Sequence, residues 1–322
     1  MKKSVLIVGG AGNLGSWITE NFFSEGWEVS ITSHSGRRSE VSRDISTIRC
    51  DLSLPKSVEK ALRGKKFHTV IHAANQNDLT QEVSFWKSYR VNVEGTSSLL
   101  HAIDKKSLKK FIFLSTFHVY GKQNGVLSER SACTPRSDYA TSHLAAEYIV
   151  QQHSFTEGFS SAILRLTNGF GAPRHPKSAN WKLLFNDLVK SAFFDKEIPL
   201  KSNPQILRDF IWMGDISRAV FKLASQDFRG CHVFNLSSGA SLTLADFAFA
   251  IRQAYLDFFG VGLPIVCENS GNRCSRLVVS SKKVWDFIGD SPTRSPKQEA
   301  IEAFQILSAL GLASDDFAKR HG

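Results

Sequence analysis

The sequence predicts an α/β fold in which a doubly wound parallel sheet carries a smaller C-terminal lobe. Short apolar runs alternate with helical patterns over residues 1–170, which is typical of parallel strands joined by crossover helices. Gly9, Gly12 and Gly15 directly follow the first apolar run, and the alternation is lost after Gly171. We therefore expect a first domain over residues 1–170, with a later return segment near residues 205–238, and a smaller lobe over residues 171–322.

The expected strands are unbroken apolar runs, as in a sheet that is buried on both faces. They cover Ser4–Val8, residues 27–32, Thr69–His72, and residues 110–114, 161–166 and 233–236. The expected helices cover residues 14–25, 181–194, 244–256 and 297–312. Proline and lysine mark residues 172–177 as a loop. We expect a ligand cleft where the two parts meet, because binding sites favour domain junctions.

Composition excludes several classes of function. The 322 residues are 42% hydrophobic, and no apolar stretch approaches the ~20 residues that cross a bilayer, so we expect a cytoplasmic protein without a membrane partner. The net charge is +10, but the basic residues are dispersed, and we expect no nucleic-acid partner. The five cysteines form no C-x-x-C pair, so neither a disulfide framework nor a metal site is expected.

The first strand runs into the sequence Gly-Gly-Ala-Gly-Asn-Leu-Gly at positions 9–15. Glycines in this context allow a tight turn, a close approach of the backbone to a pyrophosphate, and close packing of helix on strand. The following helix presents free N–H groups to the phosphates. We therefore expect Gly9, Gly12, Asn13, Leu14 and Gly15 to bind a dinucleotide cofactor.

The residues after the second strand select between NAD and NADP. An acidic residue here would bind the ribose hydroxyls of NAD, but residues 33–38 read Ser-His-Ser-Gly-Arg-Arg and contain none. The two hydroxyls of Ser33 and Ser35 and the guanidinium groups of Arg37 and Arg38 suit a 2′-phosphate. The expected cofactor is NADP, with NAD as the alternative.

Further motifs carry a resemblance to a known family. They are Asp51-Leu52, His72-Ala73-Ala74, the N-V-x-G-T pattern that starts at Asn92, the strand and turn over residues 111–121, and the blocks at residues 165–171 and 208–210. With the glycine loop, they make the chain similar to the NAD-dependent epimerase/dehydratase family, the extended short-chain dehydrogenases that act on nucleotide sugars. The resemblance implies a Rossmann-type sheet and a nucleotide-sugar substrate.

The resemblance also implies roles for individual residues. Thr116, Tyr139 and His143 would be catalytic, with Thr116 on the sugar oxygen and Tyr139 exchanging its proton. The cofactor would contact Asp51, Leu52, His72, Ala73, Ala74, Asn92, Tyr139 and His143, in addition to the residues of the two loops above. The substrate would contact Thr116, His118, Asn168, His175 and Arg208.

One catalytic position departs from the family pattern, which is Y-x-x-x-K. Here the residue four after Tyr139 is His143. The lysine holds the nicotinamide ribose and lowers the tyrosine pKa, whereas an ordinary histidine is mostly neutral at pH 7. Three interpretations stay open. His143 performs a weaker version of the lysine's role, or the enzyme is tuned to different chemistry, or the protein binds its ligands without efficient turnover.

A second departure narrows the reaction. The 4,6-dehydratases of the family carry Asp-Glu after the threonine, but Phe117 and His118 stand here. The expected function is therefore reduction of a 4-keto sugar or C4 epimerisation on a nucleoside-diphosphate sugar. The alternatives are a non-catalytic NADP-binding regulatory protein and a carbonyl reductase for a substrate that is not a sugar.

Family members often pair two helices per subunit, and the corresponding helices here would cover residues 83–104 and 138–152. We therefore expect a homodimer.

Overall fold

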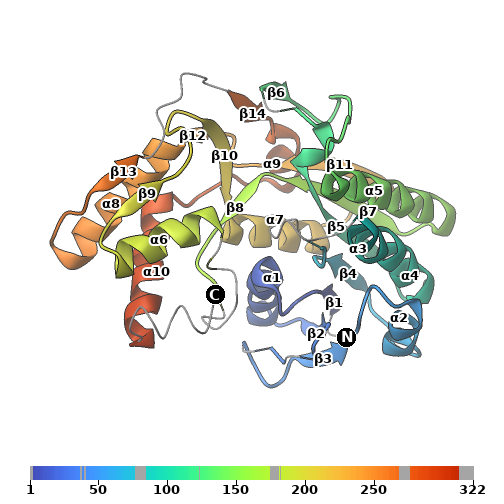
Figure 1. The fold of residues 1–322 in the computed structure, drawn as a ribbon. Helices are drawn as coiled ribbons and strands as arrows, with labels where there is room; N and C mark the ends of the chain where they lie inside the picture. The colour runs from blue at the N-terminus through green and yellow to red at the C-terminus, as the bar shows by residue number, and fades with distance from the viewer. Residues whose placement is uncertain are drawn as a thin grey trace.

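A large parallel sheet forms the centre of the protein (Figure 1). The computed structural model describes residues 3–36, 38–39, 41–76, 85–122, 124–174, 181, 183–267 and 276–311. Seven strands lie in the order β11-β7-β5-β4-β1-β2-β3, and every neighbouring pair is parallel. Their bounds are Ser4–Val8 (β1), Glu28–Ser33 (β2), Ser46–Arg49 (β3), Thr69–His72 (β4), Lys110–Thr116 (β5), Ser160–Leu166 (β7) and Cys231–Leu236 (β11). The chain moves outward from β1 to β3 and then returns to β4, so a topological switch point lies beside β1, where α/β sheets bind ligands.

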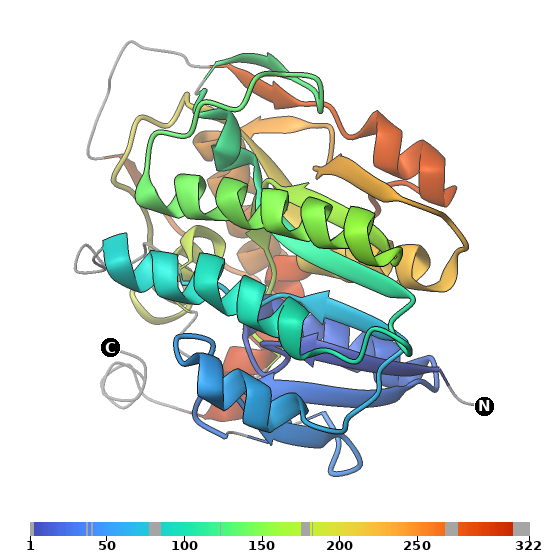
Figure 2. The ribbon, with the colours of Figure 1, turned by 90° about the vertical axis from the view of Figure 1, so that its right-hand side faces the viewer.

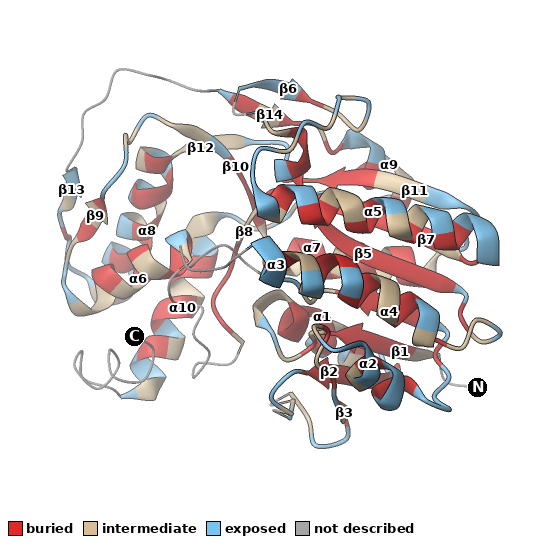
Figure 3. Cartoon of the chain, turned by 45° about the vertical axis from the view of Figure 1, so that its right-hand side comes forward, coloured by how far each residue is buried: buried red, intermediate tan, exposed pale blue. Residues whose placement is uncertain are grey.

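Helices cover both faces of this sheet. One face carries α1 (Asn13–Ser24), α7 (Met213–Ser225) and α9 (Lys282–Ile288). The other carries α2 (Pro55–Leu62), α4 (Gly95–Ala102) and α5 (Asp138–Glu157), which lie side by side in Figure 2. Before α4, the short helix α3 (Phe85–Ser88) continues into a π-helical segment, η1 (Tyr89–Glu94). The sheet is buried between these layers, which explains why its strands are unbroken apolar runs (Figure 3).

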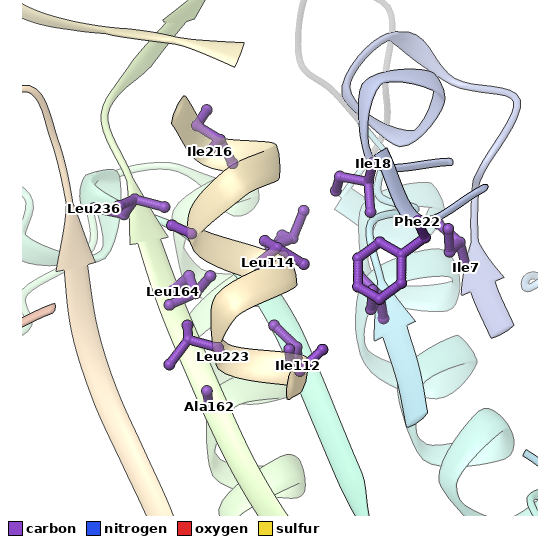
Figure 4. Packing of buried hydrophobic residues seen from close by; sticks show 14 of the residues in the cluster. Ile7, Ile18, Phe22, Ile112, Leu114, Ala162, Leu164, Ile216, Leu223 and Leu236 are labelled. Atoms are coloured by element: carbon purple, nitrogen blue, oxygen red, sulfur yellow. The ribbon is translucent and has the colours of Figure 1, made fainter. Parts of the chain in front are cut away.

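Apolar side chains from both α7 and the sheet interdigitate on the first face. Ile112, Leu164 and Leu223 meet there, and Ile18 and Phe22 extend the contact onto α1 (Figure 4). Each such side chain, when fully buried, contributes about 1.5–3 kcal/mol. This packing holds α1, and therefore the turn that precedes it, in a fixed position on the sheet.

A second core lies in the C-terminal part of the chain. It is formed by α6 (Leu184–Phe194), α8 (Leu244–Phe259) and α10 (Pro296–Leu310), together with the paired strands β9 (Ile198–Leu200) and β13 (Ile265–Cys267). A three-stranded sheet of β12 (Ser241–Thr243), β10 (Leu207–Trp212) and β8 (Asn168–Phe170) lies between this core and the large sheet (Figure 1). The strands β6 (Gly125–Leu127) and β14 (Leu277–Val279) pair above it.

The α/β class and the doubly wound parallel sheet are confirmed. Several predicted boundaries shift: β5 continues through Ser115 and Thr116, and α6 starts at Leu184 rather than at residue 181. Within the predicted return segment near residues 205–238, β11 belongs to the large sheet and α7 packs on it, whereas β10 belongs to the three-stranded sheet. The domain boundary after residue 170 stays a prediction. None of the described helices combines the length and apolar character needed to cross a bilayer.

A buried ion pair connects α5 to the middle of the large sheet. The guanidinium of Arg165, on β7, binds both carboxylate oxygens of Glu147, on α5, with an Nη2–Oε2 distance of 2.7 Å. Ser115 of β5 donates to the same carboxylate at 2.5 Å. Arg165 also donates to the hydroxyl of Tyr120, which in turn donates to Asn235 of β11. The Arg165 and Glu147 side chains are 7% and 0% exposed, so the pair is shielded from solvent.

Removal of one partner of this pair should be strongly destabilising. We expect Glu147→Leu to lower the free energy of unfolding by about 3–5 kcal/mol, because Arg165 is left as a buried, unpaired charge. The double variant Glu147→Leu/Arg165→Met should recover most of the loss. The exposed pair of Arg63 and Glu59 is the control, and Arg63→Ala should cost about 0.5 kcal/mol or less. Urea unfolding measures all three, and a small effect of Glu147→Leu would contradict this account.

Candidate active site

A cavity of about 540 Å³ opens along the carboxyl ends of β1, β2, β4 and β5, at the switch point of the sheet. It is lined by residues of the predicted ligand-binding segments and by two of the three predicted catalytic residues, whereas the third, His143, is not among the lining residues. The predicted residues that line it include Gly9, Gly12, Asn13, Leu14, Gly15, Ser33, Ala73, Ala74, Thr116 and Tyr139. The structure thus brings together residues that are up to 130 positions apart in the chain. The cavity has the volume of a site for a sizeable small molecule.

The turn after β1 is shaped for close approach of a phosphate. Gly9 has φ of 82°, and a Cβ there would lie 2.8 Å from the Cβ of Ala74. A Cβ on Gly15 would collide with the carbonyl oxygen of Gly9. Gly12 starts α1 without a side-chain cap, so the N–H groups of the first turn stay available for a ligand. The side-chain amide of Asn13 is buried, and neither its oxygen nor its nitrogen has a hydrogen-bond partner among the described residues. The residues present therefore fit a dinucleotide pyrophosphate.

A second cavity, of about 360 Å³, adjoins the first through Gly9, Thr32, His34 and Ala74. Its walls include Asp51 and Leu52, at the predicted adenine end of the cofactor. Asp51 accepts hydrogen bonds from the N–H and hydroxyl of Ser53 at 2.9 and 2.7 Å, and His34 lies 3.4 Å away. Burial acts to raise the pKa of Asp51, but these contacts outweigh it and lower the pKa.

The two arginines of the predicted phosphate loop are placed differently. Arg38 is exposed and does not line either cavity. Arg37 lies outside the described residues.

The predicted catalytic residues come from the ends of two elements. Thr116 is the last residue of β5, and its hydroxyl caps the following turn by accepting from the N–H of His118 at 3.2 Å. Ser137 caps α5 by accepting from Ala140, which places Tyr139 in the first turn of that helix. Tyr139 and His143 share one face of α5, with ring centroids 4.3 Å apart.

His143 is buried directly behind Tyr139 and is only 1% exposed. Its Nδ1 lies 2.8 Å from the carbonyl oxygen of Tyr139. Because a carbonyl oxygen only accepts, this nitrogen carries the proton and Nε2 has a free lone pair. Burial lowers the pKa of His143 to about 4, although the bond to the carbonyl acts to raise it. At neutral pH the residue in the family's lysine position is therefore an uncharged imidazole.

His72 and Asn92 lie behind the cavity and not among the residues that line it. His72 Nε2 lies 3.0 Å from the hydroxyl of Thr96, which itself donates to the carbonyl of Asn92. Burial lowers the pKa of His72 to about 3, and His143 adds to the effect. The Asn92 side chain donates to Ser142 on α5 and accepts from the N–H of Gln76 after β4. These contacts connect β4, η1 and α5 beneath the site.

A third cavity, of about 240 Å³, lies beyond Thr116. His118, Asn168 and Arg208 line it, and their chain neighbours Thr116, Thr167 and Gly169 line the first cavity. Burial lowers the pKa of His118, and the charge of Arg208 adds to the effect. Burial raises the pKa of Asp209 to about 6, despite hydrogen bonds from Thr167 and the N–H of Ser238. The predicted substrate residue His175 lies outside the described residues.

Several residues of these cavities were not predicted. Thr32, His34 and Asn75 line the cofactor side, and Lys122 lines the third cavity. These residues lie at the carboxyl end of β2, after β4 and after the η2 turn (Phe117–Tyr120). Such positions could have indicated them, since binding residues gather at the carboxyl ends of parallel strands.

The sheet order, the glycine turn and the adjoining cavities define a Rossmann-fold protein with a dinucleotide-shaped site. Residues 5–237 match the NAD dependent epimerase/dehydratase family, and the chain belongs to this family.

Three relatives illustrate the similarity. UDP-glucose 4-epimerase from Streptomyces lividans is 24% identical over 336 aligned positions, which cover 98% of this chain and 99% of the relative. The structure of UDP-glucose 4-epimerase from Thermotoga maritima, solved with UDP-glucose, has a TM-score of 0.81 at 19% identity and covers 96% of this chain and 100% of that one. The UDP-glucose 4-epimerase from Thermus thermophilus, solved with NAD, has a TM-score of 0.78 at 24% identity, with coverage of 94% and 99%.

The buried state of His143 predicts a pH dependence of stability. Its pKa is about 4 in the folded chain, against about 6.5 in an unfolded one. Between these values the unfolded chain binds a proton that the folded chain does not, so His143 makes stability fall as pH falls through this window. His143→Gln removes this contribution. The unfolding free energy of the wild type, relative to His143→Gln, should therefore decrease from pH 7 to pH 5 in urea titrations. A difference that does not change with pH would show that His143 ionises without penalty.

Proposed function

We propose that the chain transfers a hydride between NADP(H) and C4 of a nucleoside-diphosphate sugar, and that reduction of a 4-keto sugar is its working direction. The observation that carries the proposal is the position of Thr116 and Tyr139. Both line the cavity that contains the glycine turn, and the residues next to Thr116 line the third cavity with Asn168 and Arg208. The names of the relatives support a UDP-sugar as the substrate.

Each side chain then has a distinct task. A bound nicotinamide supplies or accepts the hydride. Thr116 donates a hydrogen bond to the sugar oxygen, and the Tyr139 hydroxyl exchanges a proton with it. The free Nε2 of His143 accepts a hydrogen bond from a ribose hydroxyl, where a lysine would donate one. Arg208 neutralises the diphosphate of the substrate, and Asn168, whose amide donates to the carbonyl of Asp209 at 2.9 Å, sits beside it.

The neutral imidazole favours the reductive direction. Reduction makes an alkoxide, which needs a proton donor, and an ordinary tyrosine with a pKa of about 10 is such a donor at neutral pH. Oxidation, which starts a C4 epimerisation, needs a tyrosinate as the base. A lysine would stabilise that tyrosinate, but the neutral His143 does not.

C4 epimerisation is the second candidate, because the relatives named above are 4-epimerases. The two reactions differ in their use of cofactor. A reductase consumes NADPH stoichiometrically, whereas an epimerase interconverts UDP-glucose and UDP-galactose without net consumption.

We expect the purified chain to oxidise NADPH when a UDP-4-keto sugar is added, and to form the corresponding UDP-sugar. It should form no 4-keto-6-deoxy product from a nucleoside-diphosphate glucose, because Phe117 and His118 supply no carboxylic acid for removal of water. Mass spectrometry of the products checks both expectations. Interconversion of UDP-glucose and UDP-galactose would establish the second candidate. Binding of the ligands without any turnover would favour a non-catalytic regulatory protein.

The proposed cofactor preference predicts that NADPH binds more tightly than NADH. Arg38→Ala should weaken NADPH binding by about tenfold and leave NADH binding nearly unchanged, because the 2′-phosphate is the only group that differs. Fluorescence titration measures both affinities. Equal affinity of the wild type for the two cofactors would remove the preference.

His143→Lys should shift the pH profile of the reaction. A lysine charge beside Tyr139 favours the tyrosinate, so the pH above which reduction slows should move down by about one to three units. Turnover near neutral pH should rise if the missing charge limits the rate. His143→Gln is the control, since it keeps a hydrogen-bonding group without a charge. An unchanged profile in a folded His143→Lys variant would place residue 143 outside the reaction.

The proposed assembly is a homodimer formed through α3, η1 and α5. Trp86, Tyr148 and Phe155 on these helices are 65%, 60% and 91% exposed, which is unusual for large aromatic side chains. Light scattering on the purified chain tests the assembly, and a monomeric mass would exclude it.

A further inference from the structure

Arg49 is a cation at the cofactor end of the sheet to which the sequence motifs assign no role. It is the last residue of β3 and pairs in register with Ser33, the last residue of β2. The N–H of Cys50, the next residue, donates to the carbonyl of Ser33 at 3.1 Å. The backbone of Arg49 is therefore fixed beside the turn that follows β2.

The side chain of Arg49 lies along this turn. Gly36 has φ of 76°, and a Cβ built there would be 3.7 Å from Cδ and 3.9 Å from Cγ of Arg49. Within the same turn, the N–H of Gly36 donates to the carbonyl of Ser33, and the hydroxyls of Ser33 and Ser35 are 3.5 Å apart. Ser33 and Ser35 line the main cavity. One cation and two hydroxyl groups thus border the same turn.

The charge of Arg49 is available for a ligand. Arg49 is exposed, and its side chain makes no hydrogen bond or ion pair with another described residue. The nearest carboxylate in sequence, Asp51, is already engaged by Ser53 and His34. Arg49 pairs in register with Ser33, and its guanidinium has no partner among the described residues, so it can donate the forked hydrogen bonds that a phosphate monoester accepts.

We infer that Arg49, with the hydroxyls of Ser33 and Ser35, binds the 2′-phosphate of NADP and is a specificity-determining residue of the site. The inference rests on the proposed preference for NADP. It adds a cation from β3 to the arginines that the sequence places in the loop after β2.

The test is a set of titrations of the full chain with four ligands. NADPH and adenosine 2′,5′-bisphosphate carry the 2′-phosphate, whereas NADH and AMP do not. Arg49→Ala should weaken the first two by about tenfold and change the last two by less than about twofold. Arg49→Lys should recover part of the loss, because it restores the charge but not the fork. Arg43→Ala is the matched control: Arg43 is also exposed but precedes β3, at the opposite end of the strand, and its loss should change none of the affinities.

The possible outcomes distinguish a failure of the inference about Arg49 from a failure of the proposed preference for NADP. If the wild type binds NADH and AMP as tightly as the 2′-phosphorylated ligands, the cofactor proposal fails. If the wild type prefers NADPH but Arg49→Ala leaves that preference intact, the inference about Arg49 is overturned while the cofactor proposal stands. Equal weakening of all four ligands by Arg49→Ala would also overturn it, because the residue would then support the turn and not the phosphate. If Arg43→Ala weakened NADPH binding as much as Arg49→Ala does, the effect would come from general surface charge, and the inference about Arg49 would be overturned.

Discussion

The placement of Tyr139 relative to Thr116 depends on the buried ion pair between Glu147 and Arg165. Glu147 lies one helical turn beyond His143 on the same face of α5, and two turns beyond Tyr139. Its carboxylate binds Arg165 on β7 and Ser115 on β5, and Ser115 directly precedes Thr116. One carboxylate therefore fixes the helix that carries Tyr139 against the strand that carries Thr116. A contact between apolar side chains alone would allow α5 to shift along the sheet. The bidentate bond from Arg165 and the additional hydrogen bond from Ser115 fix both the rotation of α5 and its position along the strands.

Behind the reacting centre, burial determines which groups are charged. His72 and His143 are each 1% exposed, and burial lowers their pKa values to about 3 and about 4. Both imidazoles are therefore neutral at pH 7. In each ring one nitrogen is held by a hydrogen bond, and this bond decides which nitrogen keeps the lone pair. His72 Nε2 bonds to the hydroxyl of Thr96, and His143 Nδ1 bonds to the carbonyl of Tyr139. The substitution of histidine for lysine in the family pattern thus replaces a positive donor with a neutral acceptor, and the surrounding residues fit that neutral form.

Much of this arrangement could be predicted from the sequence, because local patterns determine it. The apolar runs give β1, β4 and β5, and the spacing of Gly9, Gly12 and Gly15 gives the turn into α1. The strands at Ser46–Arg49 and Leu207–Trp212 are short or carry charged residues, so no apolar run marks them. The partners of Arg165 could not be predicted either. A charge inside an apolar strand signals a buried partner, but which carboxylate meets it depends on how α5 packs on the sheet. In the same way, only the register of β2 and β3 brings Arg49 beside Ser33.

The distribution of charge across the site follows from these constraints. Arg49 ends β3 beside Ser33, and Arg208 and Lys122 line the third cavity, while the position behind Tyr139 holds a neutral ring. Cations at the two ends can bind the phosphate groups of two anionic ligands. Binding of these distant groups then orients the reacting carbons of the two ligands toward each other. Between them, a cation beside Tyr139 would favour the ionised form of the tyrosine. The neutral His143 gives no such stabilisation, which fits the reductive direction of the proposed function better than the oxidative one.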